Sequence, residues 1–257
     1  MKRILASLLV SIGVACVTNP ETGRKQAILF SDGQMNSMGE QAYTEVKQKE
    51  KISSDARVTE IVVRVGKRIA EASGAKFAWE FTYLDSPKTV NAFCLPGGKV
   101  AVYSGLIPIA KNEAGLAAVL GHEVAHAVAR HGAERMTQQT GAQAVMAVAN
   151  ILTPDSQVRG IALGVLGIGL QGAVLLPFSR KHESEADYMG LRYMAKAGYD
   201  PEEAVSLWQR MAKLGGSTPE FISTHPDPQR RAEALRNDLP EAKGLWDKSS
   251  KQPTTAI

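Results

Sequence analysis

The sequence contains little cysteine, few aromatic residues and no strong excess of either charge. Its 257 residues include only two cysteines, which excludes a disulfide framework. Aromatic residues make up 6% of the chain, and no basic stretch is interleaved with them, so the net charge of +4 does not indicate nucleic-acid binding. Hydrophobic residues at 44% and charged residues at 22% are typical of globular proteins, which excludes a disordered chain and a multi-span membrane protein.

The N-terminus has the pattern of an export signal. Lys2 and Arg3 precede an apolar run over residues 4–14, which is shorter than the roughly 20 residues of a membrane span. Small residues then precede Cys16, as in a bacterial lipoprotein signal. We therefore expect a signal peptide over residues 1–15, a lipid on Cys16 and a periplasmic location at the outer membrane of a bacterial cell envelope. An ordinary secretory signal with an incidental Cys16 is the alternative.

The rest of the chain predicts one domain over residues 31–243. Residues 16–30 are polar and rich in turn residues, which predicts a tether or a surface arm. A helix is predicted from the capping box of Ser31 and Gln34 to about Lys49, and another over 56–72, where apolar residues recur at helical spacing. Residues 244–257 are polar and without periodicity, which predicts a loose tail.

A small sheet is expected beside the helices. Residues 77–83 alternate in the manner of a strand, and 90–94 and 100–103 predict a hairpin around Pro96-Gly97-Gly98. The chain that follows is mostly helical, so the predicted fold class is α+β, mainly α with a small antiparallel or mixed sheet. The apolar run over 161–178 is close to span length, and we expect a buried helix there, with a membrane span as the alternative.

The histidines carry the clearest chemical signal. The sequence has five, all between His122 and His225. In the segment His122-Glu123-Val124-Ala125-His126, the two imidazoles lie four residues apart and share one face of a helix, so both can reach one ion. Glu123 is placed to take a proton from a metal-activated water. A pair of surface histidines is the alternative, but the flanking residues are apolar on nearly all sides. One Zn²⁺ per chain is therefore expected.

The acidic cluster over 179–187 is the best source of a third ligand. Glu183 and Asp187 lie four residues apart on one helical face, whereas Glu185 points away, so its replacement by alanine is expected to cost neither metal nor activity. We expect Glu183 to bind zinc and Asp187 to accept a hydrogen bond from a zinc-bound imidazole. The alternative is a solvated helix start with acids favoured by the helix dipole. His131 would lie about 140° away from His126 on a continuous helix, which makes it a poor ligand.

Together these motifs resemble the zinc peptidase family of the HtpX heat-shock protease and the CAAX prenyl endopeptidases, and most of all its exported periplasmic lipoprotein branch. The matching segments run in family order over about residues 35–237: Asn91-Ala92-Phe93, Pro96-Gly97-Gly98, Val102–Leu106, Asn112-Glu113, Gly121–His126, Ser179–Glu183, Ala186-Asp187, His225-Pro226 and Arg231. The resemblance implies a gluzincin-like core in which Glu183 is the third zinc ligand. The chain lacks the several membrane spans of HtpX and the prenyl proteases, which argues against intramembrane or prenyl-protein substrates.

The resemblance also suggests roles for residues whose spacing alone says little. It places His225 at the active site, where it could donate to the oxyanion, although a loop-capping histidine is the alternative. Arg231 could support a carboxylate or the chain around His225, or be an exposed helix residue. Asn91 and Ala92 lie on a predicted edge strand to which an extended peptide could add by main-chain hydrogen bonds, or which is an ordinary hairpin edge.

Two functions remain open at this point. The first is a zinc endopeptidase of misfolded or unassembled envelope proteins, in which zinc activates a water and Glu123 is the general base that later protonates the leaving amine. The second is a chaperone or assembly factor at the outer membrane with a structural zinc, acting with envelope assembly partners. Glu123 favours the enzyme, because a structural zinc site needs no base beside its ligands.

Overall fold

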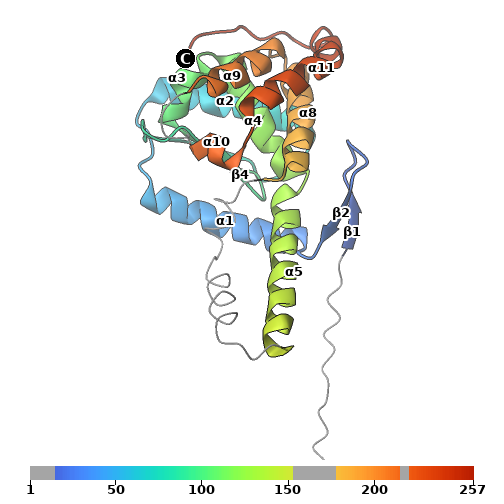
Figure 1. Ribbon diagram of the computed structural model, residues 1–257. Helices are drawn as coiled ribbons and strands as arrows, with labels where there is room; N and C mark the ends of the chain where they lie inside the picture. Colours follow the sequence, from blue (N-terminus) through green and yellow to red (C-terminus); the bar gives the residue numbers. More distant parts are fainter. Residues whose placement is uncertain (1–14, 153–177, 215–219) are drawn as a thin grey trace, which may run out of the picture.

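A computed structural model describes residues 15–152, 178–214 and 220–257 (Figure 1). In chain order the elements are β1 (Ala15–Thr18), β2 (Lys25–Ile28), α1 (Asp32–Lys49), α2 (Ala56–Ser73), β3 (Glu80–Leu84), β4 (Ala92–Leu95), β5 (Lys99–Tyr103), η1 (Ser104–Leu106), α3 (Ile107–Ala110), α4 (Glu113–Val128), α5 (His131–Leu152), α8 (Arg180–Lys196), α9 (Glu202–Ala212), α10 (Glu220–Thr224) and α11 (Pro228–Trp246). The predicted α+β class, mainly helical with small sheets, is confirmed.

Two sequence predictions fall largely on residues outside these ranges. The expected signal peptide and the apolar run over 161–178 lie outside the described residues, apart from Ala15 and Phe178. Among the helices that the structure does describe, none combines the length and apolarity that crossing a membrane requires.

The predicted hairpin and strand join in one three-stranded mixed sheet. β4 pairs antiparallel with β5, with Ala92 opposite Val102, and β3 pairs parallel with β5, with Phe81 opposite Val100. The strand order β3-β5-β4 leaves β4 at an edge. Gly97 and Gly98 turn the chain between β4 and β5 with φ angles of 83° and 86°, which suit glycine.

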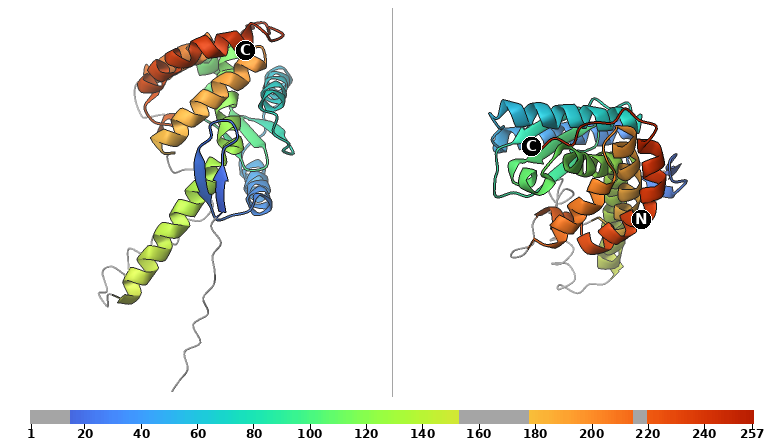
Figure 2. Two further views of the ribbon diagram at one scale, coloured as in Figure 1. Left: turned by 90° about the vertical axis from the view of Figure 1, so that its right-hand side faces the viewer. Right: turned by 90° about the horizontal axis from the view of Figure 1, so that it is seen from above.

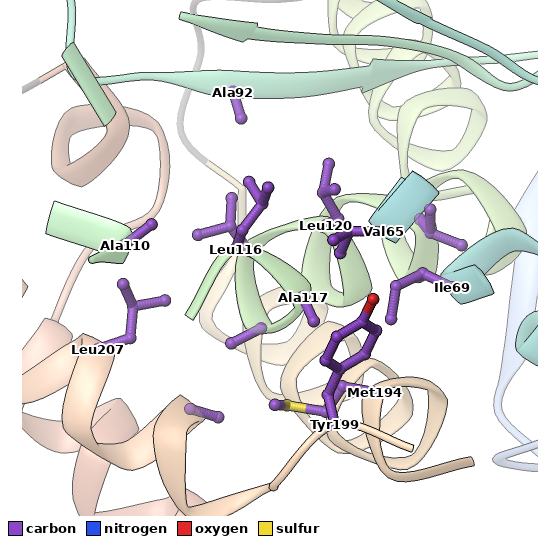
Figure 3. Packing of buried hydrophobic residues seen from close by; sticks show 14 of the residues in the cluster. Val65, Ile69, Ala92, Ala110, Leu116, Ala117, Leu120, Met194, Tyr199 and Leu207 are labelled. Carbon is purple, nitrogen blue, oxygen red and sulfur yellow. The ribbon is translucent and has the colours of Figure 1, made fainter. Parts of the chain in front are cut away.

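Helix α4 lies at the centre of the molecule. Its residues are apolar on nearly all sides, which is typical of a helix buried all round. Figure 3 shows Leu116 and Leu120 on the side of α4 that faces Ala92 of the sheet, with Tyr199 on the other side. The N-terminus of α4 is capped by Asn112, whose side chain accepts from the backbone N–H of Gly115 at 2.8 Å.

Helix α8 crosses α4 at a contact between two glycines. A Cβ atom on Gly190 would lie 2.7 Å from both the carbonyl carbon of Gly121 and the backbone nitrogen of His122, so neither helix could stay where it is. This close approach lies directly beside His122. It brings the carboxylates of α8 within reach of the imidazoles of α4.

The expected tether contains a hairpin. β1 and β2 pair antiparallel, with Cys16 opposite Ala27, and a turn at Asn19–Gly23 joins them. Contacts from β2 reach α5, and Figure 2 shows the hairpin against the body of the molecule, from which α5 projects. The polar turn residues predicted a connecting segment here. They did not predict that this segment is attached to α8, because polar side chains make that attachment and hydrophobic periodicity does not reveal them.

The expected loose tail is also held in place. α11 continues to Trp246, whose indole N–H donates to the carbonyl of Gly198 at 2.9 Å. Beyond it, the backbone N–H of Gln252 donates to the same carbonyl at 2.9 Å, and that of Ile257 donates to the carbonyl of Lys111 at 3.1 Å. Backbone hydrogen bonds hold this extended segment, and they depend little on side-chain type, so the absence of periodicity did not reveal them.

Candidate active site

Two helices and one loop bring four potential metal ligands together. His122 and His126 lie on α4, Glu183 lies in the first turn of α8 and His225 follows α10; all four are buried, and their ligand atoms lie within 4.8 Å of one another. The Nε2 atoms of His122 and His126 are 3.0 Å apart. Each of them lies 3.4 Å from an oxygen of Glu183.

The two 3.4 Å spacings between the imidazoles and Glu183 fit a zinc ion. Ligand atoms about 2.0–2.1 Å from a tetrahedral zinc would be separated by about 3.3–3.4 Å along the edges of the tetrahedron. Two imidazoles and one carboxylate are also a ligand set that catalytic zinc uses. His225 Nδ1 lies 3.1 Å from His122 Nε2 and 3.1 Å from Glu183 Oε1, so its ring stands at the fourth side of the same site.

Asp187 and Arg231 surround the ligands with charge. Asp187 Oδ1 lies 3.1 Å from His122 Nδ1, and Arg231 Nη2 lies 2.8 Å from the same nitrogen. Arg231 is buried, not exposed: its Nε donates to Asp187 Oδ2 at 2.8 Å and its Nη1 lies 2.7 Å from Glu183 Oε2. The guanidinium carbon lies 3.4 Å from the centre of the Trp208 ring, so the cation also has an aromatic face beneath it.

The surroundings keep Glu183 and His126 in the forms that bind metal. Burial acts to raise the pKa of Glu183, but His225 and Arg231 outweigh it and hold that pKa well below its usual range. Burial lowers the pKa of His126 well below its usual range, which favours the neutral imidazole. An ionised carboxylate and a neutral imidazole are the states that coordinate zinc.

Glu123 lies beside the ligands, and one of its carboxylate oxygens accepts no hydrogen bond from the described residues. It is 2% exposed, and its Oε1 makes no hydrogen bond within the described part of the chain, although His225 Nε2 is 3.4 Å away. Burial raises the pKa of Glu123, although the nearby His225 acts to lower it. A buried carboxylate oxygen that lacks a partner is costly, so its position calls for an explanation.

Glu185 and His131 make buried contacts that residue spacing does not predict. Glu185 points away from the metal ligands as expected, yet it is buried, and its Oε2 lies 2.9 Å from Nε2 of His131. His131 Nδ1 in turn lies 2.9 Å from His126 Nδ1. Burial lowers the pKa of His131 to about 4, so the ring is neutral at pH 7.

A break in the helix explains why His131 was missed. The prediction assumed that one helix carries both His126 and His131. In the structure α4 ends at Val128, and Arg130 takes a left-handed conformation with φ of 56° before α5 starts at His131. The only hint in the sequence is the polar Arg130-His131-Gly132, which does not fix the direction of the next helix.

Asn91 and Ala92 lie where the edge-strand interpretation placed them. Ala92 begins β4, and both residues are buried. The backbone N–H of Tyr103 donates to the carbonyl of Asn91 at 3.1 Å, so Asn91 faces β5 and Ala92 directs its backbone groups towards the open edge. Asn91 Oδ1 accepts from the backbone N–H of Ala92 at 2.9 Å, which leaves the Ala92 carbonyl as the edge acceptor.

Comparison with known proteins identifies the family. Residues 54–239 match the model of peptidase family M48. The mitochondrial metalloendopeptidase OMA1 of Schizosaccharomyces pombe is 42% identical over 80% of this chain and 61% of the relative. The OMA1 protein of Arabidopsis thaliana is 37% identical over 79% of this chain and 41% of the relative. The beta-barrel assembly-enhancing protease of Escherichia coli is 26% identical over 97% of this chain and 54% of the relative. The chain thus spans about half the length of the curated relatives it matches.

The same relatives correct the predicted location. The two relatives with identities of 37% and 42% are mitochondrial proteins by name, so the prediction of a bacterial periplasm and outer membrane is wrong. Two basic residues and a short apolar run indicate targeting but do not by themselves specify the compartment.

The family resemblance inferred from the motifs is confirmed by the match over residues 54–239. The relatives are metalloendopeptidases by name, and the described residues of this chain include a buried group that could hold a metal ion. This chain belongs to peptidase family M48.

Proposed function

We propose that the chain is a zinc-dependent endopeptidase that hydrolyses polypeptides, with His122, His126 and Glu183 as zinc ligands and Glu123 as the general base. The observation that carries this proposal is the buried Glu123 Oε1, which has no hydrogen-bond partner in the described residues and lies beside the ligand cluster. A reacting water would supply the missing partner. The metalloendopeptidase names of the relatives support the same reaction.

Each side chain has a distinct task in this proposal. Zinc, when bound, polarises the scissile carbonyl and lowers the pKa of a water to about 7. Glu123 accepts a proton from that water and then gives it to the leaving amine. Its raised pKa suits a carboxylate that must hold a proton for part of the cycle. Asp187 orients His122, and Arg231 holds both Asp187 and Glu183.

A chaperone or assembly factor with a structural zinc is the competing interpretation. It would use His225 as a fourth ligand, since structural zinc sites are closed. It gives no reason for Glu123 to be buried without a hydrogen bond next to the ligands. The names of the relatives do not favour it either.

Removal of the metal tests the proposed reaction. The purified chain is expected to contain one zinc and to cleave casein, to lose cleavage when a chelator removes the metal, and to regain it when zinc is restored. Cleavage would be followed by the release of soluble peptides and zinc by elemental analysis of the same preparation. Casein cleavage at full rate after complete removal of zinc would rule out the metal-dependent mechanism.

His225→Phe is expected to lower kcat while zinc stays bound. His225 Nε2 lies 3.4 Å from Glu123, close enough to the reacting centre to donate to an oxyanion, and loss of one such donor costs about 10²–10³-fold in kcat. The measurement is kcat on casein together with zinc content. An unchanged kcat would return His225 to a loop-capping role, and a higher kcat would show that its ring obstructs the fourth side of the site.

Two finer predictions remain as proposals. We infer that a substrate segment adds to the edge of β4, where the backbone carbonyl of Ala92 faces away from β5. Lipid attachment at Cys16 also stays a prediction, supported by the exposed position of this cysteine on β1. No assembly partner is assigned.

A further inference from the structure

We propose that Glu185 and His131 position the zinc ligand His126, and that the hairpin of β1 and β2 holds Glu185 for this purpose. The proposal rests on the zinc centre described above. It assigns roles to a buried cluster of charged side chains that the proposed reaction does not use.

Two hydrogen bonds connect His126 to Glu185. His126 Nδ1 and His131 Nδ1 are 2.9 Å apart, and His131 Nε2 lies 2.9 Å from Glu185 Oε2. Because His126 directs its Nε2 to the metal site, its Nδ1 carries the proton and donates. His131 Nδ1 must then accept, which leaves the proton of His131 on Nε2, facing the carboxylate. The donor and the acceptor of both hydrogen bonds between His126 and Glu185 are therefore fixed.

The two ligand histidines thus have matching supports from one helix. His122 lies directly against Asp187 of α8, with 3.1 Å between Nδ1 and Oδ1. His126 lies farther along α4 and reaches Glu185 of α8 through the ring of His131. A carboxylate behind a ligating imidazole fixes the ring orientation and raises its basicity, and His131 extends the reach of Glu185 to provide it.

The hairpin supplies the donors that fix Glu185. Asn19 Nδ2 donates to Glu185 Oε1 at 2.8 Å, and the hydroxyl of Thr22 and the Nε of Arg24 also donate to this carboxylate. Arg24 further bonds Glu134 of α5, with 3.0 Å between Nη1 and Oε1. The guanidinium therefore pairs with a carboxylate of α8 and a carboxylate of α5 at the same time.

The hairpin also contacts the helix break that places His131. The side-chain amide of Gln26, on β2, donates to the carbonyl of Ala129 at the C-terminal end of α4. Arg130 follows in its left-handed conformation, and His131 then begins α5. The same hairpin therefore stabilises both ends of the link, the carboxylate of Glu185 and the turn that presents His131.

Zinc affinity tests the proposal independently of peptidase activity. His131→Phe and Glu185→Gln are each expected to weaken zinc binding about 10–100-fold, the usual effect of losing a partner behind a metal ligand. The buried contacts of Glu185 thus replace the expectation from helical spacing that its loss costs no metal. Arg24→Ala is expected to weaken it in the same direction. Lys25→Ala, at the next residue, which is exposed and begins β2, is the matched control and should leave affinity unchanged. Affinity is measured by competition with a chelator in the full chain, with circular dichroism to establish folding.

Two further readouts separate positioning from a general loss of stability. The visible absorption spectrum of the cobalt-substituted protein should change in the His131 and Glu185 variants, because the orientation of a ligand ring changes. The double variant should also bind zinc about as weakly as the weaker of the two single variants, since both act through one chain of hydrogen bonds.

The contrary results are equally specific. Wild-type zinc affinity and an unchanged cobalt spectrum in the folded His131 and Glu185 variants would overturn the proposal, as would fully additive losses in the double variant. Unchanged affinity in Arg24→Ala would overturn the role of the hairpin. If the variants weaken zinc binding as expected but the unaltered protein does not cleave casein, the proposed endopeptidase function is contradicted and the positioning role of Glu185 and His131 is not.

Discussion

Glu123→Gln is expected to bind zinc as the unaltered chain does and to lose peptidase activity. The amide has nearly the same shape, but it cannot take a proton from water or return one to the leaving amine. Loss of a general base typically lowers the rate about 10²–10⁴-fold. The measurement is kcat on casein, with zinc content determined on the same preparation.

Glu113→Gln provides a matched control on the same helix. Glu113 is also a buried glutamate of α4, but it lies in the first turn and pairs with Arg64, 2.7 Å away. This variant should keep its zinc and its cleavage rate in the folded protein. If Glu123→Gln still cleaved casein at the unaltered rate, another group would have to be the base.

Glu183→Ala is expected to lose both zinc and activity. The carboxylate is the only proposed ligand from α8, and its oxygens lie 3.4 Å from the Nε2 atoms of His122 and His126. The change would also remove the partner of Arg231 Nη1 and leave more positive charge around the two imidazoles. Elemental analysis after gel filtration measures the zinc, and casein cleavage measures the activity.

Ser184→Ala is the control for this variant. Ser184 is the exposed neighbour of Glu183, and its hydroxyl donates to the carbonyl of Arg180 within the same helix. Zinc and activity should both be retained. Stoichiometric zinc in purified, folded Glu183→Ala would show that another side chain is the third ligand.

Helical periodicity was sufficient to predict the centre of the site. A spacing of four residues puts His122 and His126 on one face of α4, and the same spacing puts Glu183 and Asp187 on one face of α8. These relations hold within a single helix, so they can be derived from the sequence. The positions of one helix relative to another cannot, and spacing alone could not establish the contacts of Arg231 and His225.

Other parts of the arrangement depend on interactions without a local pattern. The hairpin of β1 and β2 is attached by Asn19, Thr22 and Arg24, whose partner Glu185 lies far away in the sequence. The position of His131 depends on one left-handed residue, Arg130. Neither hydrophobic periodicity nor residue spacing contains this information.

The order of the helices along the chain has a consequence for protein synthesis. The ribosome releases α4 with both histidines first, then α8 with Glu183, and finally α11 with Arg231. A growing chain therefore displays two imidazoles before it has the carboxylate that completes the ligand set and the guanidinium that holds it. In our proposal the nascent protein cannot hydrolyse peptides, and its activity appears only when most of the peptidase domain has left the ribosome.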